Sequence, residues 1–110
     1  MGRIVSIRAV TTESTTVNMR MFPNPVDPAR GEVLTIDRLP NDVITLAIYT
    51  LRGERVDDLD HTVVYEPVTG IARWKGRIHD GRPAASGSYL VRVETKRGSL
   101  GKGVFLVARK

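Results

Sequence analysis

Three aspartates and a glutamate form the densest group of potentially reactive side chains in the sequence. Asp57, Asp58 and Asp60 lie within one short stretch, shortly after Glu54. Paired carboxylates of this kind could bind calcium or serve as the acid and base of glycoside hydrolysis. Their spacing lacks the regular oxygen ladder of a calcium loop, and no row of aromatic residues is present to line a sugar cleft. We therefore predict a solvated hairpin, with a calcium site as the alternative.

The other reactive residue types are isolated. His61 and His79 fall in separate predicted turns without carboxylates at metal-ligand spacing, so both are expected to be exposed loop residues. The segment 86–88 lacks the pattern of a nucleophile elbow and leads into a strand instead of a helix. No nucleophile and base stand at usable spacing, and the chain has no cysteine. The sequence therefore predicts no catalytic, metal or cofactor site, and a protein that is not an enzyme.

The elements that must position these side chains are short strands. Runs of alternating polarity recur between turn residues, and no segment has a helical period, which is typical of an all-β sandwich. In the strongest strand, 43–50, Ile44, Leu46 and Ile48 are expected on one face and Ala47 and Tyr49 on the other. This strand is therefore expected to be covered on both sides or to lie in the middle of a sheet. In chain order, strands are predicted over 4–10, 17–22, 33–39, 43–50, 56–59, 62–65, 70–75, 86–94 and 103–110, with a turn over 98–102.

The chain is predicted to divide into an N-terminal arm, 1–16, and a sandwich, 17–110. The arm joins a β-forming run to a threonine-rich tether, so it could fold back on its own sheet or add to a sheet edge of a neighbouring copy. The last strand ends the sequence and is expected to leave such an edge available. The candidate assembly strands contain Ile4, Val5, Ile7, Val104, Phe105 and Val107, and apolar surface beside the edge is expected from Phe105, Val107, Tyr49 and Ala47.

Composition limits the partners. The 110 residues are enough for one domain, and 17 basic against 12 acidic residues give a net charge of +5. This charge favours weak attraction to anionic partners, including acidic glycans. Aromatic residues make up only 5%, so the stacking platforms of nucleic-acid binders are not expected. No apolar run is long enough to span a membrane, and the N-terminus lacks the apolar core of a secretory signal.

Five short motifs occur in order along residues 20–110. They are a Pro-Asn-Pro turn, a strand ending in Ile-Tyr before a glycine turn, a Trp-Xaa-Gly, a Ser-Gly-Xaa-Tyr and a basic last strand. In this order they resemble the immunoglobulin-like domain of flagellar hook-capping proteins and the C-terminal sorting domains of the type IX secretion system. The residues that carry the resemblance are Pro23, Asn24, Pro25, Tyr49, Gly53, Trp74, Gly76, Gly87, Tyr89 and Lys102.

The resemblance implies an immunoglobulin-like antiparallel β-sandwich of about seven core strands, here with an N-terminal extra strand or arm, and no active site. It also implies an extracellular or cell-surface module that secretion machinery recognises, and that sorts, anchors or spaces a larger protein. Two positions depart from the family, because Lys75 and Thr50 stand where it usually has aspartate.

Two other functions remain open at this stage. One is a self-assembling subunit, such as a surface filament, a sheath or a phage decoration protein, whose copies join by strand addition into a homo-oligomer. The other is a glycan-binding module that uses an exposed Trp74 beside basic side chains. We expect Trp74 instead at the packing centre of the sandwich, because burying its ring removes a large apolar area from water.

Overall fold

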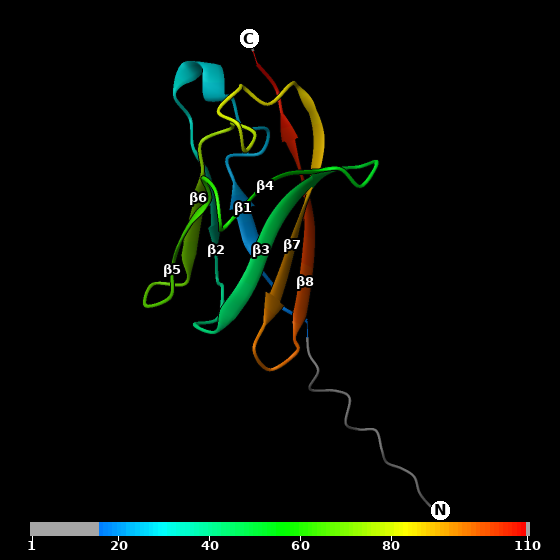
Figure 1. The fold of residues 1–110 in the computed structure, drawn as a ribbon. Coiled ribbons are helices and arrows are strands. Elements are labelled where there is room, and N and C mark those ends of the chain that lie inside the picture. The colour runs from blue at the N-terminus through cyan, green and yellow to red at the C-terminus, as the bar shows by residue number, and fades with distance from the viewer. Residues whose placement is uncertain (1–15, 110) are drawn as a thin grey trace, which may run out of the picture.

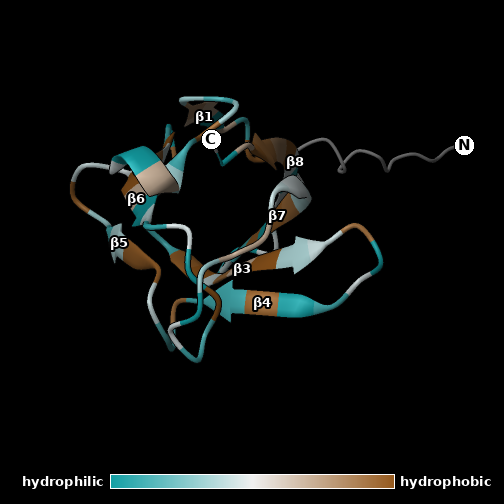
Figure 2. Cartoon of the chain, turned by 90° about the horizontal axis from the view of Figure 1, so that it is seen from above, coloured by the Kyte–Doolittle hydropathy of each residue, from teal (hydrophilic) through white to brown (hydrophobic). Residues whose placement is uncertain are grey.

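The protein is an all-β sandwich. In the computed structural model, which describes residues 16–109, eight strands form two four-stranded sheets that face each other (Figures 1 and 2). Each described strand overlaps a predicted one, which confirms the predicted fold class. The strands are β1 (Arg20–Phe22), β2 (Leu34–Asp37), β3 (Val43–Thr50), β4 (Arg55–Asp58), β5 (Val64–Glu66), β6 (Ile71–Trp74), β7 (Gly87–Thr95) and β8 (Leu100–Val107).

The strand order corresponds to immunoglobulin topology. One sheet has the order β1-β2-β6-β5 and the other β4-β3-β7-β8, with every pair antiparallel. These orders match the A-B-E-D sheet and the C′-C-F-G sheet of immunoglobulin-like sandwiches. A short 3-10 helix, η3 (Pro28–Arg30), lies between β1 and β2. No helix among the described residues is long and apolar enough to cross a membrane.

An aromatic cluster fills the space between the sheets. Trp74 is fully buried, and its ring centroid lies 5.6 Å from that of Phe105 and 5.9 Å from that of Tyr89. The tilted and edge-on arrangements are those that aromatic quadrupoles favour. Buried aliphatic side chains from both sheets surround the cluster, among them Leu34, Ile36, Leu46, Ile48, Val91 and Val93. The prediction that Trp74 belongs to the core is therefore confirmed.

Strand β3 departs from simple alternation at its start. Val43 lies opposite Thr95, but Thr45 lies opposite Glu94, so Ile44 is an extra residue in the pairing. Such a bulge turns the side chain outward, and Ile44 is 54% exposed while Val43 is buried. The prediction that Ile44 shares a face with Leu46 and Ile48 is wrong for this reason. The prediction that β3 lies inside a sheet is confirmed.

The outer edge of β8 is bridged at both ends by the segment that leads into and out of β1. The Val17 amide donates to the Leu100 carbonyl at 2.8 Å, and the Val26 amide donates to the Leu106 carbonyl at 2.9 Å. The Asn24 side chain accepts from the Leu106 amide at 2.9 Å. The edge expected to be open is therefore already contacted by the chain itself, and β8 begins at Leu100, within the segment predicted as a turn.

The inward side of β8 also differs from the assembly prediction. Phe105 is fully buried and Val107 is 2% exposed, because both point between the sheets, and Ala47 is buried as well. These three side chains do not provide apolar surface for a partner. Val104 is on the outward side and is 53% exposed. The other predicted assembly strand, with Ile4, Val5 and Ile7, lies outside the described residues.

Candidate functional site

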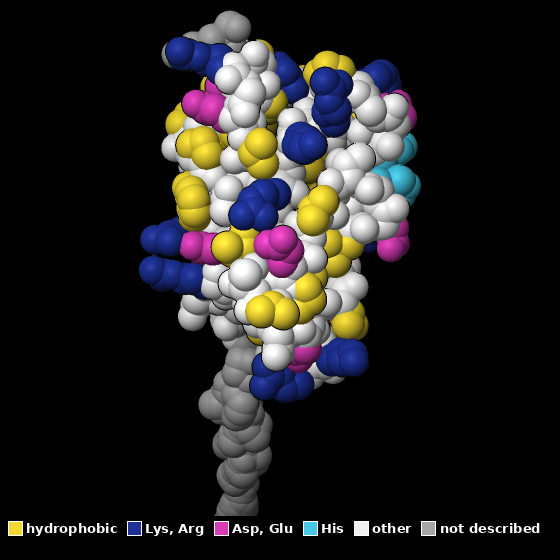
Figure 3. All heavy atoms as spheres, turned by 90° about the vertical axis from the view of Figure 1, so that its left-hand side faces the viewer, with side chains coloured by type: hydrophobic (Ala, Val, Ile, Leu, Met, Phe, Trp, Pro, Cys, Tyr) yellow, Lys and Arg dark blue, Asp and Glu magenta, His cyan; other side chains and the backbone are white. Residues whose placement is uncertain are grey.

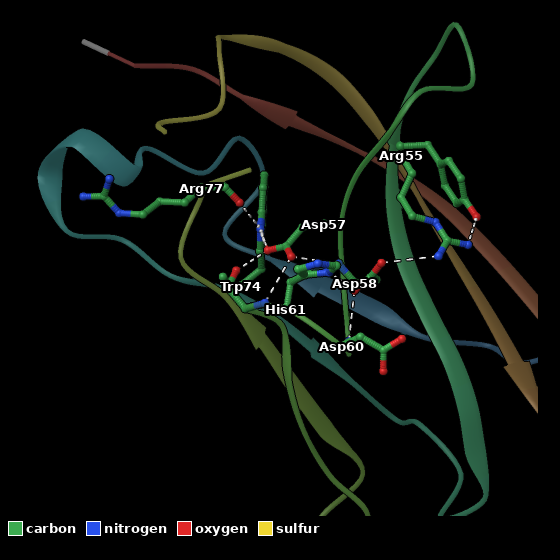
Figure 4. A network of polar contacts seen from close by, with 9 residues as sticks. Arg55, Asp57, Asp58, Asp60, His61, Trp74 and Arg77 are labelled. Carbon is green, nitrogen blue, oxygen red and sulfur yellow. Dashed lines mark hydrogen bonds and ion pairs between the residues drawn. The ribbon is translucent and has the colours of Figure 1, made fainter. Parts of the chain in front are cut away.

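The carboxylate of Asp57 is a buried centre of hydrogen bonding at the end of β4. It accepts from the backbone amides of Asp58 and Thr62 at 2.8 and 3.1 Å, and also from the Thr62 hydroxyl. The indole Nε1 of Trp74 donates to it across the sandwich at 2.9 Å (Figure 4). Asp57 is fully buried, so the prediction of a solvated hairpin is wrong for this residue.

The second acceptor of the Trp74 indole is the Arg77 carbonyl, also at 2.9 Å. One N–H group therefore joins β6, the loop that follows it and the end of β4. Buried polar groups without partners are costly, and these contacts leave both the indole and the Asp57 carboxylate satisfied. The arrangement fixes the position of the core tryptophan from its polar side.

Asp58 forms the outer part of the same network. Its carboxylate lies 2.6 Å from Nδ1 of His61 and 3.3 Å from Nη1 of Arg55, and it accepts from the Asp60 amide at 3.0 Å. Burial alone would raise the pKa of Asp58, but the hydrogen bonds from His61, Asp60 and Arg55 together hold it below its ordinary value. The hydrogen bond to Asp58 raises the pKa of His61.

The rings of the two histidines lie close together although they come from separate turns, and one of them, His61, also contacts a carboxylate. The ring centroids of His61 and His79 are 5.5 Å apart. His61 is exposed, as predicted, but it does have a carboxylate partner in Asp58, which the sequence analysis did not predict. The partner lies three residues before the histidine, and only the tight turn after β4 brings their side chains together.

Three of these side chains satisfy the spacing of a metal site. Ligand atoms of Asp57, Asp58 and His61 lie within 4.8 Å of one another. However, the Asp57 oxygens already accept from protein donors, and a cation there would compete with the Trp74 indole. The Asp58 oxygens are likewise occupied by Arg55 and His61. The hydrogen bonds account for both carboxylates as structural groups.

The His61–Asp58 contact should make stability depend on pH. Since the folded pKa of His61 is raised above 6.5, its stabilisation is fully present below that value and is lost as pH rises through the raised pKa. Since the pKa of Asp58 is lowered below 3.8, the contact persists until pH falls through that lowered value. We expect the stability difference between wild type and His61→Gln, measured in urea, to shrink as the pH rises above about 6.5.

A second measurement isolates the pair. In a proton NMR titration, Asp58→Asn should move the pKa of His61 back toward its ordinary value, because the carboxylate that raises it is removed. An unchanged pKa for His61 in Asp58→Asn would show that the ion pair does not form in solution.

The motif residues lie at turns and at strand ends, where they have structural contacts. The Tyr89 hydroxyl donates to the Ala85 carbonyl at 2.6 Å, an arrangement similar to the tyrosine corner of immunoglobulin-like domains. The Gly53 amide donates to the Thr50 carbonyl at 2.9 Å and closes the β3–β4 hairpin. Lys102 is an exposed residue on β8, and Asn24 holds the edge of the same strand.

The sequence did not indicate the structural hydrogen bonds that Arg109 forms. Arg109 donates from Nε to the Ala84 carbonyl at 2.6 Å and from Nη2 to the Gly76 carbonyl at 2.9 Å. The end of the chain is thereby fastened to the loop between β6 and β7. No local pattern indicates these contacts, because the sequence around an arginine that follows a strand is the same whether its side chain is hydrogen-bonded or solvated.

The burial of Trp74 also decides against one of the open functions. A sugar-stacking platform requires an exposed ring face, and none of the Trp74 ring is accessible. The glycan-binding interpretation that depends on Trp74 is therefore wrong.

Fold and site together describe a β-sandwich module whose polar centre is occupied by structural hydrogen bonds. No family model and no curated protein matches the sequence. Among solved structures, the chain is similar to PorZ, an essential bacterial surface component of the type-IX secretion system of Porphyromonas gingivalis. The two are 27% identical with a TM-score of 0.66, over 84% of this chain and 12% of PorZ, so the chain corresponds to a small part of that protein's length.

Proposed function

We propose that the chain is a non-enzymatic, extracytoplasmic immunoglobulin-like module of a type IX secretion pathway, which sorts, anchors or spaces a larger protein at the cell surface. The observation that carries the proposal is the similarity to PorZ, a surface component of that system, over 84% of the chain. The ordered motifs of the sequence support it independently, because they resemble those of type IX sorting domains and of the immunoglobulin-like domain of flagellar hook-capping proteins.

The contacts of the motif residues support a module whose function depends on its folded surface. Asn24 contacts β8, the Tyr89 hydroxyl contacts the loop that precedes β7, and the Gly76 carbonyl accepts from Arg109, just after β8. They hold the C-terminal ribbon β7–β8 in place and contribute no reactive group. A role in recognition fits such residues better than a role in chemistry.

A reporter fusion tests the proposal. The full chain would be fused behind an exported reporter, in cells with an active type IX translocon and in matched cells without one. We expect the reporter to be accessible to added protease at the surface only when both the module and the translocon are present. Equal surface exposure in the two strains would refute the proposal.

Truncation of the last strand is a poor control, because Phe105 and Val107 are core residues and their removal would unfold the sandwich. A better control is Asp60→Ala, which alters an exposed side chain near the Asp57 network. The Asp60→Ala fusion should be displayed like wild type. A destabilised Trp74→Ala fusion should lose display if the translocon recognises the fold.

A further inference from the structure

Two cations lie directly opposite one another on the outer face of the β4-β3-β7-β8 sheet. Arg92 of β7 pairs in register with Lys102 of β8, and both side chains are exposed. Like charges in this position destabilise a sheet. Within residues 16–109, neither Arg92 nor Lys102 forms an ion pair, whereas the following arginines each pair with an acid: Arg20, Arg55, Arg73, Arg82 and Arg97.

An apolar row lies beside this cationic pair. Tyr49, Leu90 and Val104 are in register across β3, β7 and β8, and Leu90 and Val104 lie two positions along their strands from the cations. Tyr49 and Leu90, together with Leu51 from the β3–β4 hairpin, line a shallow groove of about 370 Å³, and Arg92 and Lys102 line it as well. Val104 continues the apolar surface beyond the groove.

The distance between the two rows indicates what the groove fits. Residues two positions apart on a strand are separated by about 6.6–6.8 Å. An extended peptide has the same repeat, so an apolar side chain and a carboxylate two positions apart would contact the two rows at once. Burial of the apolar side chain and neutralisation of the opposed cations would both favour binding.

The groove is less suited to a glycan. The guanidinium of Arg55 lies 5.5 Å from the centroid of the Tyr49 ring and covers one of its two faces, which leaves less of the ring for stacking against a sugar. The opposite sheet offers no equivalent site, because its outer face mixes basic and acidic side chains (Figure 3), and it pairs Arg73 with Glu66.

We propose that the outer face of β3, β7 and β8 binds an extended acidic segment of a partner protein, in which an apolar and an acidic side chain stand two positions apart. The inference deepens the proposed function, because it names the chemistry of the protein that the module would contact. It can be tested with the purified full chain and needs no secretion machinery, so either proposal can fail alone.

The probe is a fluorescent peptide that repeats Leu-Ser-Glu-Ser, which places leucine and glutamate on one side of an extended chain. A matched peptide that repeats Leu-Glu-Ser-Ser has the same composition but places them on opposite sides. By fluorescence anisotropy, we expect saturable binding of the first peptide and binding at least about tenfold weaker for the second. Equal binding of the two peptides, or no saturable binding of the first, would overturn the proposal.

Charge reversal locates the site. Lys102→Glu should weaken binding of the first peptide by about tenfold or more, whereas Lys75→Glu, which changes an exposed residue just after β6, should leave it unchanged. Because Lys102→Glu replaces a like-charge pair with an opposite-charge pair, its urea midpoint should not fall below that of wild type. Retained binding by Lys102→Glu, or tighter binding of heparin that displaces the peptide, would contradict a peptide site.

Discussion

Replacing Asp57 with alanine should be among the most destabilising single substitutions in this domain, with an expected loss of about 3–5 kcal/mol. The substitution removes the acceptor of the Asp58 and Thr62 amides and one acceptor of the Trp74 indole. Each buried donor left without a partner costs about 1–3 kcal/mol. Since small domains are stable by about 5–15 kcal/mol, a large part of the native stability would be lost.

Urea unfolding followed by fluorescence is the appropriate measurement, because Trp74 is the only tryptophan of the chain and sits at the network itself. Asp60→Ala is the matched control, since Asp60 lies in the same turn with an exposed side chain, and its effect should stay within about 0.5 kcal/mol. A loss below about 1 kcal/mol in Asp57→Ala would mean that water or rearrangement replaces the carboxylate.

A double-mutant cycle separates the indole contact from the amide contacts. Trp74→Phe removes the donor but keeps an aromatic ring in the core. If the Asp57–Trp74 hydrogen bond contributes, the two substitutions together should cost less than the sum of the single effects. If the two free-energy losses are strictly additive, Asp57 stabilises the domain only through its hydrogen bonds with the Asp58 and Thr62 amides.

The sequence predicted the fold well because the fold depends on local pattern. Alternation located β3 and β7, and the burial of Trp74 followed from its size. Ile44 was misplaced because one extra residue reverses which face a side chain occupies, and only the pairing with β7 reveals the bulge.

The candidate site was less predictable because its contacts are distant in sequence. In the sequence, Asp57 is one of several acids in a polar stretch, and only the fold brings the Trp74 indole of β6 to it from 17 residues away. The covered edge of β8 likewise depends on Val17 and Val26, which pair with residues near the opposite end of the chain. Composition and alternation contain no information on such pairings.

The second large effect is expected at Gly76, which lies against Pro28 of η3. Gly76 has a φ of +81°, and a Cβ at this position would lie 2.3 Å from Cγ and 2.6 Å from Cβ of Pro28 in η3. A proline ring cannot move aside as a flexible side chain would. Gly76→Ala should therefore combine about 1–2 kcal/mol of left-handed backbone strain with about 1–3 kcal/mol of overpacking.

Gly81→Ala is the matched control for Gly76→Ala. Gly81 has a φ of +93° and belongs to the same loop, but a Cβ there would meet nothing within 4 Å, so only the backbone cost of about 1–2 kcal/mol is expected. In urea unfolding, adding Pro28→Ala to Gly76→Ala should recover the packing part of the loss. If Gly76→Ala costs no more than Gly81→Ala, or if Pro28→Ala recovers nothing, the close contact between η3 and the end of β6 is not what requires glycine.

If Gly76→Ala does cost more and Pro28→Ala does recover the packing part, the structure explains the Trp-Xaa-Gly motif. Trp74 fills the core, and Gly76 lets η3 pack against the loop that Arg109 also contacts.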